Sequence, residues 1–384
     1  MQTDQYNFFL VIPIGFNDIG KNELINKWTL YFPSEEPPYY ELQHGGIEVH
    51  TSLNYGHSLN KILKVPSNIL LRLDKFKCRD FPKLFKKISK FNWSNYLIGQ
   101  MPQVKASAHN SRLIHSGRIE ETVINAINKY YKGMPASKSN MNKIPTIPKT
   151  VIHIRIVDDD CTLSINTSGE RLNIRNQRTL IGPAPLRENL AAALLYLLQS
   201  FIKQGTNIET RLIDPMCGTA IFLLEAATAN SKNKDRQFSY EFFPIVQSTF
   251  NLTEVNNELF DSYLGFDINP KIVEIAQNNL KNFNTTIQVK DIFLKRQLIS
   301  PEKQNFVILN PPYGKRINIK GNKNDFFQQL LTSIEVNYLP ELIGIILPEK
   351  NFKYQSKDYH LKLKLNFSNG GYAVCFYLYS KIER

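Results

Sequence analysis

The sequence has few cysteines and no long apolar run. Its four cysteines are widely separated and show no C-x-x-C spacing, so they indicate neither a disulfide framework nor a zinc site. No unbroken apolar stretch reaches the ~18 residues that a membrane helix needs, and residues 1–16 contain Asp4 in place of a basic leader segment. We therefore expect no export, no membrane insertion, no bound metal, and a location in the reducing cytoplasm.

Acidic residues are scarce in one part of the chain. Residues 51–150 contain 18 Lys and Arg against four Asp and Glu, whereas the 384-residue chain as a whole has a net charge of +13. A basic block of this kind suits a polyanion, since each Lys or Arg placed on a phosphate releases condensed counterions. The alternative is a solvated basic face without a partner. The length of the chain predicts two or three domains.

The N-terminal half has the apolar periodicity of a mixed α and β structure. The pattern predicts strands at 8–13, 69–76, 103–108, 151–157 and 161–166, a hairpin through Gly45 and Gly46, and helices at 17–28, 55–63, 81–91 and 117–131. The helix at 81–91 has an apolar stripe. Its opposite face carries Lys83, Lys86, Lys87 and Lys90, which we expect to contact a polyanion.

The C-terminal half alternates strands and helices. A polar connector at 169–185, which ends in Gly182-Pro183-Ala184-Pro185, precedes it. The pattern then predicts helices at 187–203, 220–229 and 270–283, and strands at 211–213, 263–266, 286–289 and 306–309. Such alternation predicts a doubly wound, mostly parallel α/β sheet, in which ligands bind beyond the carboxyl ends of the strands.

Polar residues follow three of these predicted strands. The segment from Asp214 to Ala220 reads as a tight loop that opens a helix, where amides and the positive helix end can meet a ligand. Asp267 follows the next strand, where it can accept hydrogen bonds from ribose hydroxyls, and Asp291 follows the third. Taken singly, each aspartate is more simply explained as the N-cap of the next helix.

The fourth strand runs directly into Asn310-Pro311-Pro312-Tyr313. Paired prolines hold the backbone extended and leave local carbonyls free as acceptors. The Asn310 amide oxygen can accept a further N–H, and a base can stack on the Tyr313 ring. Two acceptors aimed at one amino group orient its lone pair toward an electrophile, which methylation of an exocyclic amine requires. The alternative is a Pro-Pro turn that merely ends a strand.

These motifs resemble those of class I S-adenosylmethionine-dependent RNA methyltransferases with an N-terminal THUMP module. Residues 214–227 resemble the family's cofactor loop and helix, 310–313 its N-P-P-Y signature, and 185–194 the helix that leads into its catalytic domain. Further segments that look like the family lie at 45–48, 70–73, 105–113, 156–164 and 369–371. The resemblance therefore covers nearly the whole chain.

The resemblance implies an α/β fold, in which a Rossmann-like doubly wound methyltransferase sheet at 186–384 follows an α+β module. That module would comprise a ferredoxin-like domain at 1–60 and a THUMP RNA-binding domain at 61–168, with a linker at 169–185. The implied reaction is transfer of a methyl group from S-adenosylmethionine to guanine N2 in structured RNA, either large-subunit ribosomal RNA or tRNA. Methylation of adenine N6, and an RNA-binding protein without catalysis, are the alternatives. The oligomeric state is open.

The resemblance also implies roles for single residues, with direct transfer and no metal or cysteine nucleophile. The cofactor would be held by Asp214, Pro215, Met216, Cys217, Gly218, Thr219, Asp267, Ile268, Asp291, Ile292 and Asn310. The target base would be held by Asn310, Pro311, Pro312 and Tyr313. Expected RNA contacts are Lys83, Lys86, Lys87, Lys90, Lys105, Ser107, His109, Ser111, Arg112, Lys315 and Arg316.

One position departs from the family pattern. The family loop commonly reads C-G-S-G-T, whereas here it reads Cys217-Gly218-Thr219-Ala220-Ile221. If the replaced glycine has a positive φ, the methyl group of Ala220 is strained and cofactor affinity falls. If that position has a helical φ, alanine is harmless there.

Overall fold

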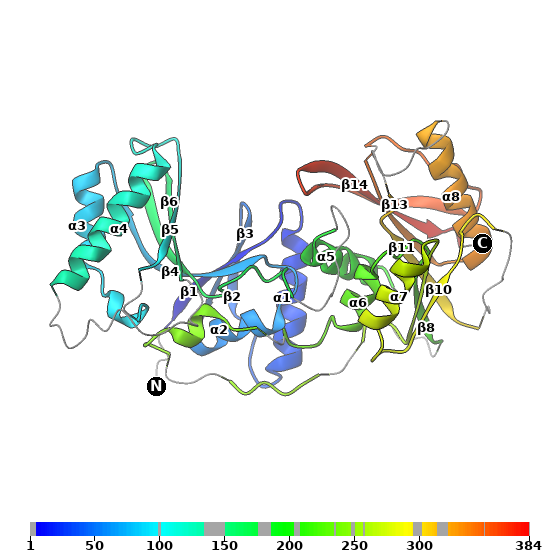
Figure 1. The fold of residues 1–384 in the computed structure, drawn as a ribbon, viewed down its shortest axis with the longest axis horizontal. Helices are drawn as coiled ribbons and strands as arrows, with labels where there is room; N and C mark the ends of the chain where they lie inside the picture. Colours follow the sequence, from blue (N-terminus) through cyan, green and yellow to red (C-terminus); the bar gives the residue numbers. More distant parts are fainter. Residues whose placement is uncertain are drawn as a thin grey trace. The chain divides into compact units, whose positions relative to one another are not determined.

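The computed structural model describes residues 5–98, 101–133, 150–175, 186–202, 208–233, 236–246, 250–255, 258–294, 302–312, 322–348 and 350–383. The chain folds into two units (Figure 1). The first contains the chain up to Pro13, Gly20–Ile174 and Asn233–Thr253, and the second contains Ile14–Ile19, Arg175–Lys232 and Glu254–Arg384. None of the described helices is long and apolar enough to cross a membrane.

The first unit is built on a seven-stranded sheet with the order β2-β3-β1-β4-β7-β6-β5. Its strands are β1 (Tyr6–Val11), β2 (Tyr39–Gln43), β3 (Gly46–Thr51), β4 (Asn68–Lys77), β5 (Gln103–His109), β6 (Val151–Val157) and β7 (Asp160–Asn166). All neighbours are antiparallel except β5 and β6. Because β1 pairs with β4, the strands before and after residue 60 share one sheet. The expected division at residue 60 stays a prediction.

Helices of the first unit cover one face of this sheet. They are α1 (Asn17–Tyr31, whose first turn belongs to the second unit), α2 (Leu53–Ile62), α3 (Phe81–Lys90) and α4 (Ser116–Lys132). Helix α2 packs on β1, β3 and β4, and α4 packs on β5 and α3. Alternation along the strands places Phe8, Leu71 and Ile165 in one lateral row on the covered face, where all three are buried. The opposite face carries the polar residues of the same strands.

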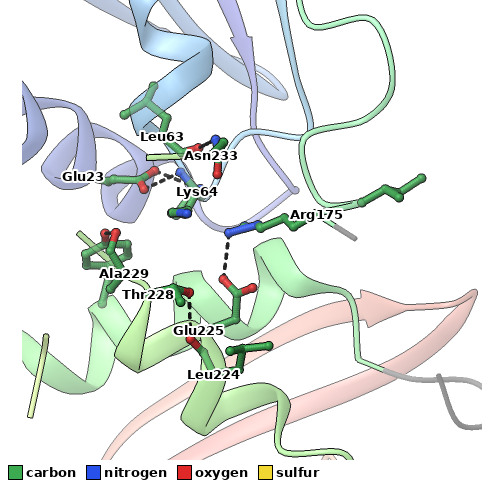
Figure 2. Close-up of polar contacts among 12 residues, drawn as sticks. Glu23, Leu63, Lys64, Arg175, Leu224, Glu225, Thr228, Ala229 and Asn233 are labelled. Carbon is green, nitrogen blue, oxygen red and sulfur yellow. Dashed lines mark hydrogen bonds and ion pairs between the residues drawn. The ribbon is translucent and has the colours of Figure 1, made fainter. Parts of the chain in front are cut away.

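Residues 233–253 lie between two elements of the second unit but are part of the first. The Asn233 side chain donates to the carbonyls of Asn60 and Leu63 at 2.9 and 3.0 Å, and so caps the end of α2 (Figure 2). Tyr240, in the 3-10 helix η3 (Ser239–Phe242), stacks on His57 with ring centroids 4.6 Å apart. This segment therefore completes the core of the first unit.

The buried His57 predicts a loss of stability at acid pH. Burial lowers the pKa of His57 from about 6.5 to about 3, so between these values the unfolded chain binds a proton that the folded chain does not. The stability that His57 contributes is present above pH ~6.5 and is lost by up to about 1.4 kcal/mol per pH unit as the pH falls below it. His57→Phe keeps the stacked ring, and its melting temperature should fall less steeply toward acid pH. If the melting temperature of both proteins changed equally with pH, this role of His57 would be contradicted.

The second unit is a seven-stranded sheet with the order β10-β9-β8-β11-β12-β14-β13. Its strands are β8 (Thr210–Asp214), β9 (Ser262–Asp267), β10 (Thr285–Val289), β11 (Gln304–Leu309), β12 (Leu342–Leu347), β13 (Tyr359–Asn369) and β14 (Tyr372–Lys381). The five strands β8 to β12 are parallel, and the hairpin β13–β14 adds two antiparallel strands. This is the predicted doubly wound α/β sheet.

Helices cover both faces of the second sheet (Figure 1). They are α5 (Glu188–Gln199), α6 (Ile221–Ala227), α7 (Pro270–Asn279) and α8 (Lys323–Tyr338). Helix α6 packs on α5, β8 and β9, and α7 packs on β9 and β10, whereas α8 lies on an apolar core made by the other face of the sheet. Glu225 of α6 forms an ion pair of 2.8 Å with Arg175, and both side chains are almost fully buried (Figure 2).

Candidate functional site

Four polar residues lie at the carboxyl edge of the parallel strands. Asp214 and Asp267 are the last residues of β8 and β9, Asp291 follows β10 by two residues, and Asn310 follows β11 directly. Because these strands are parallel and adjacent in the order β10-β9-β8-β11, all four residues lie at the same edge of one sheet. The strand order reverses between β8 and β11, which is where open α/β sheets hold their ligands.

The loop after β8 is held against the end of β9. The amide of Cys217 donates to the Phe266 carbonyl at 2.8 Å, and the amide of Gly218 donates to the Asp267 carboxylate at 3.2 Å. Gly265 permits this approach, because a Cβ atom there would lie 2.9 Å from Leu223 and 3.2 Å from the Cys217 sulfur. Burial and the two nearby aspartates raise the pKa of the Cys217 thiol, so it stays protonated and is a poor nucleophile.

Ala220 adopts the left-handed conformation, with φ +65° and ψ 41°, and its side chain is fully buried. Position 220 therefore has a positive φ and not a helical one, so the alanine there is strained. The structure also starts α6 at Ile221, one residue later than the predicted helix.

Ala220→Gly is expected to stabilise the protein by about 1 kcal/mol, because glycine adopts a positive φ without the clash of a Cβ atom. Thermal unfolding measures this effect. The matched control is Ala226→Gly, which is buried in the last turn of α6, has no positive φ and should destabilise by up to about 1 kcal/mol. If Ala220→Gly were as destabilising as the control, strain at position 220 would be ruled out.

Asp214 is a buried carboxyl group whose one direct donor among the described residues is the Met216 amide at 3.1 Å. Burial, and then the nearby Asp267, raise the pKa of Asp214 from 3.8 to about 8. The folded protein therefore binds a proton that the unfolded chain does not hold between these values. The stability contributed by this group falls by up to about 1.4 kcal/mol per pH unit as the pH rises from ~4 to ~8.

Asp214→Asn keeps the acceptor for the Met216 amide but cannot ionise. We expect its melting temperature to exceed that of the wild type increasingly as the pH rises toward 8. A cationic ligand that pairs with this carboxyl group should bind the variant more weakly, because the ionisable group is gone. A melting temperature that changes with pH in parallel with the wild type would contradict the raised pKa.

Asn310 presents an acceptor without a partner. Its Oδ1 atom is buried, and within the described part of the chain no donor lies within hydrogen-bond distance. A buried acceptor of this kind is unfavourable unless a ligand supplies the donor. Pro311 is buried and Pro312 half-buried. Tyr313, Lys315 and Arg316, which were predicted to hold the base and the RNA, lie outside the described residues.

Asp267 and Asp291 differ in how much of their bonding capacity is used. The Asp267 oxygens each accept one amide, from Gly218 at 3.2 Å and from Asn269 at 2.9 Å, and each oxygen has a further lone pair for a hydroxyl donor. The Asp291 carboxylate accepts a hydrogen bond from the Phe293 amide at 2.9 Å. This bond forms the local turn that is expected of an aspartate after a strand.

Apolar side chains next to these aspartates are divided between surface and core. Ile268 is 69% exposed and Phe293 40% exposed, although both are large apolar residues. Ile292, which the sequence placed at the cofactor, is 2% exposed and belongs to the core beneath α8. Phe293 is therefore the exposed apolar side chain beside Asp291, and the cofactor contact of Ile292 stays a prediction. The sequence alone does not reveal which of these two neighbouring residues is exposed, because that depends on which of them faces the core.

The predicted lysine face of α3 is exposed. Lys83, Lys86, Lys87 and Lys90 line a surface hollow of about 780 Å³, whereas Leu84 and Ile88 of the same helix are buried. Asp80 caps the helix by accepting the Lys83 amide at 2.7 Å. On its other side α3 packs on α4, where Arg118 lies 4.3 Å from the Phe81 ring centroid. The structure thus concentrates four cations on one accessible helix face.

Of the RNA contacts predicted on β5 and in the loop after it, some make hydrogen bonds inside the first unit. Lys105, Ser107 and His109 are exposed on β5, and Arg112 is exposed in the following loop. The Ser111 hydroxyl donates to the His109 carbonyl and accepts the Asp159 amide, and the Arg112 amide donates to the Asp159 carboxylate. Ser111 therefore stabilises this loop, whereas the exposed side chains of the other four residues are accessible to a ligand.

Comparison with known proteins identifies two domain families in the chain. Residues 175–362 match the model of the RMKL-like methyltransferase domain (UPF0020), and residues 78–166 match the THUMP domain. The chain is 26% identical over 341 residues to the ribosomal RNA large subunit methyltransferase K/L of Desulfotalea psychrophila, with 83% of this chain covered. It spans less than half of that relative, 45% of its length.

Two further proteins match over the whole chain. The tRNA (guanine(6)-N2)-methyltransferase of Methanocaldococcus jannaschii is 22% identical over 406 residues, which cover 97% of this chain and 99% of that protein. The crystal structure of SMU.472, a putative methyltransferase complexed with SAH, superimposes over 100% of both chains with a TM-score of 0.75 and 21% identity. This structural likeness establishes the fold.

Proposed function

We propose that this chain, which combines a THUMP domain with an RMKL-like methyltransferase domain, transfers a methyl group from S-adenosylmethionine to the exocyclic N2 of a guanine in RNA. The observation that carries the proposal is the buried, unpartnered Asn310 Oδ1 at the carboxyl edge of β11, beside the loop of Asp214. Both relatives described above are named as RNA methyltransferases, and one as a guanine-N2 enzyme.

The residues at this edge fit the chemical groups of the cofactor. S-adenosylmethionine supplies an electrophilic methyl group on a sulfonium, together with an ammonium, a ribose and an adenine. Asp214 would pair with the cationic end, since this buried carboxyl has no cationic partner among the described residues. Asp267 would accept the ribose hydroxyls, and the exposed Ile268 and Phe293 would cover the adenine ring.

Asn310 would act on the methyl acceptor. Its Oδ1 accepts one N–H of the guanine amino group, and the extended backbone at Pro311 offers a carbonyl for the other. With both hydrogens held, the nitrogen lone pair points away from the ring plane toward the methyl donor. Formation of the N–CH3 bond would break the S–CH3 bond and leave a neutral thioether, and N2 would lose one proton to solvent, so no nucleophilic side chain is required.

RNA would be bound by the first unit. The lysines of α3, together with Lys105 and Arg112, would contact phosphates, because each exposed cation placed on a phosphate releases counterions, and Ser107 and His109 would contact the same RNA. We assign residues 61–168 to RNA binding and 186–384 to catalysis, with the segment 233–253 as a structural part of the first unit. We also place this reaction in the cytoplasm, on ribosomal RNA in preference to tRNA.

Nucleoside mass spectrometry tests the proposal directly. Ribosomal RNA and tRNA are fractionated separately from cells with and without the gene, and their methylated nucleosides are measured. Loss of N2-methylguanosine from one fraction supports the proposed reaction and identifies the RNA. Loss of N6-methyladenosine instead would assign adenine as the target, and unchanged nucleosides in every fraction would contradict catalysis and favour an RNA-binding role alone.

A further inference from the structure

A second hollow lies on the first sheet, on the face opposite α2 and α4. It has a volume of about 340 Å³, within the range of ~300–1,000 Å³ that small ligands occupy, and it is centred on β3, β1 and β4. Glu48, His50, Arg72, Lys75 and Thr162 are among the residues that line it. The acidic side chains of Glu41 and Asp74 also line it, and Asp74 lines the hollow of the α3 lysines as well.

Arg72 forms a rigid, flat surface in this hollow. Its Nε donates to both Glu48 oxygens at 3.2 Å, its Nη2 donates to Glu48 Oε2 at 3.1 Å, and its Nη1 donates to the Ser164 hydroxyl at 3.1 Å. The guanidinium carbon lies 4.2 Å from the centroid of the Phe9 ring. The guanidinium is therefore fixed at its edges and covered on one face, while 17% of the side chain remains exposed.

Strand β4 has an irregularity next to Arg72. The pairing of β4 with β7 shifts between Arg72 and Asp74, as in a β-bulge. Bulges reorient single side chains and are concentrated next to ligand sites, because they interrupt an otherwise regular ladder. Here the shift follows directly after Arg72, and Lys75, which follows it, also lines the hollow.

The hollow shares its sheet face with expected RNA contacts. Paired residues form one lateral row of Lys105, His153, Ser164 and Arg72 across β5, β6, β7 and β4. Burial lowers the pKa of His153 to about 4, so this residue is neutral near pH 7 and the charges of the row lie at its two ends. Ser107 and His109 follow Lys105 at alternate positions of β5 and are exposed on the same face. A strand of RNA that contacts Lys105, Ser107 and His109 could therefore extend along this same sheet face to the hollow.

We propose that this hollow binds an unpaired nucleobase of RNA, stacked on the face of the Arg72 guanidinium opposite Phe9. Proteins recognise single-stranded RNA by stacking bases on aromatic rings and guanidinium planes, and a guanidinium already immobilised loses little entropy when a base stacks on it. Lys75 supplies a cation for the phosphate of the same nucleotide. The inference rests on the proposed RNA-methylating function, and it adds a single-strand contact separate from the phosphate contacts of α3.

Photo-crosslinking of the wild-type protein gives the first test. Short single-stranded RNA carrying a photoreactive uridine is irradiated with the full chain, and the modified peptides are identified by mass spectrometry. Adducts on β1, β3 or β4 peptides support the site. Adducts confined to α3 and the loop after β5 would overturn it, as would a wild-type protein that binds no RNA, which would overturn the proposed function as well.

Arg72→Lys gives the second test, because lysine keeps the charge and the Glu48 pair but loses the flat stacking surface. We expect about tenfold weaker binding of single-stranded RNA, the scale of one lost stacking contact, with an unchanged salt slope and unchanged duplex binding. Arg118→Lys is the matched control, since it removes a guanidinium stacked in the same way on Phe81 but outside the hollow.

The outcomes of the second test separate the two proposals. Weaker single-strand binding in Arg72→Lys alone supports the nucleobase site. Equal losses in both variants, or no loss in Arg72→Lys while the wild type binds and methylates RNA, would overturn the site and leave the proposed function standing. Circular dichroism and thermal unfolding establish that both variants are folded before their affinities are compared.

Discussion

Asn310→Ala is expected to reduce methyl transfer by about 10²–10³-fold, while RNA affinity and melting temperature remain close to those of the wild type. The lost group is an acceptor aimed at charge that develops in the transition state, and removal of one such preorganised group typically has an effect of this size. Stability should not fall, because Oδ1 has no protein partner among the described residues and its removal relieves an unsatisfied buried acceptor.

Single-turnover transfer to RNA measures the effect on chemistry, and fluorescence anisotropy measures RNA affinity. Asn282→Ala is the matched control, since this exposed asparagine lies in the same unit but just before β10, at the amino edge of the parallel strands. A variant at position 310 with wild-type turnover would refute the role of this residue. A variant that lost RNA binding to the same extent as activity would assign Asn310 to substrate affinity instead of transfer.

Replacement of Lys83, Lys86, Lys87 and Lys90 by Glu should weaken RNA binding by at least tenfold at moderate salt. Each lysine on a phosphate contributes about 0.9 to the slope of log affinity against log salt on duplex regions, so the slope should fall by up to about 3–4. All four side chains are exposed, and the apolar face of α3 is untouched. The melting temperature should therefore change little.

The matched control makes the same change of net charge on the second unit, at the exposed residues Lys350, Lys353, Lys357 and Lys362. Both quadruple variants are compared with the wild type in RNA binding at several salt concentrations. A loss confined to the α3 variant identifies a local contact surface. Equal losses in the two variants would mean that net charge alone attracts the RNA, and the α3 face would then be an ordinary solvated surface.

Two features of the protein follow from local rules and were predicted from the sequence. The lysine face of α3 depends only on the 3.6-residue period of a helix, which places Leu84 and Ile88 together on one side and the lysines on the other. The convergence of Asp214, Asp267, Asp291 and Asn310 depends only on the rule that adjacent parallel strands end at one edge.

Other features depend on contacts between distant parts of the chain. The φ of Ala220 was left open by the sequence, because it depends on the hydrogen bonds that hold residues 217 and 218 to the end of β9. The choice of Phe293 over Ile292 as the exposed residue depends on the core under α8.

The sequence by itself determined the two kinds of sheet, the basic helix and the set of polar residues at the strand ends, since each follows from spacing along a single segment. Only the tertiary structure decided that residues 233–253 complete the first unit and that Arg72 stacks on Phe9. The physical reason is that both arrangements join residues far apart in sequence, and their favourable energy comes from burial and packing that no local periodicity encodes.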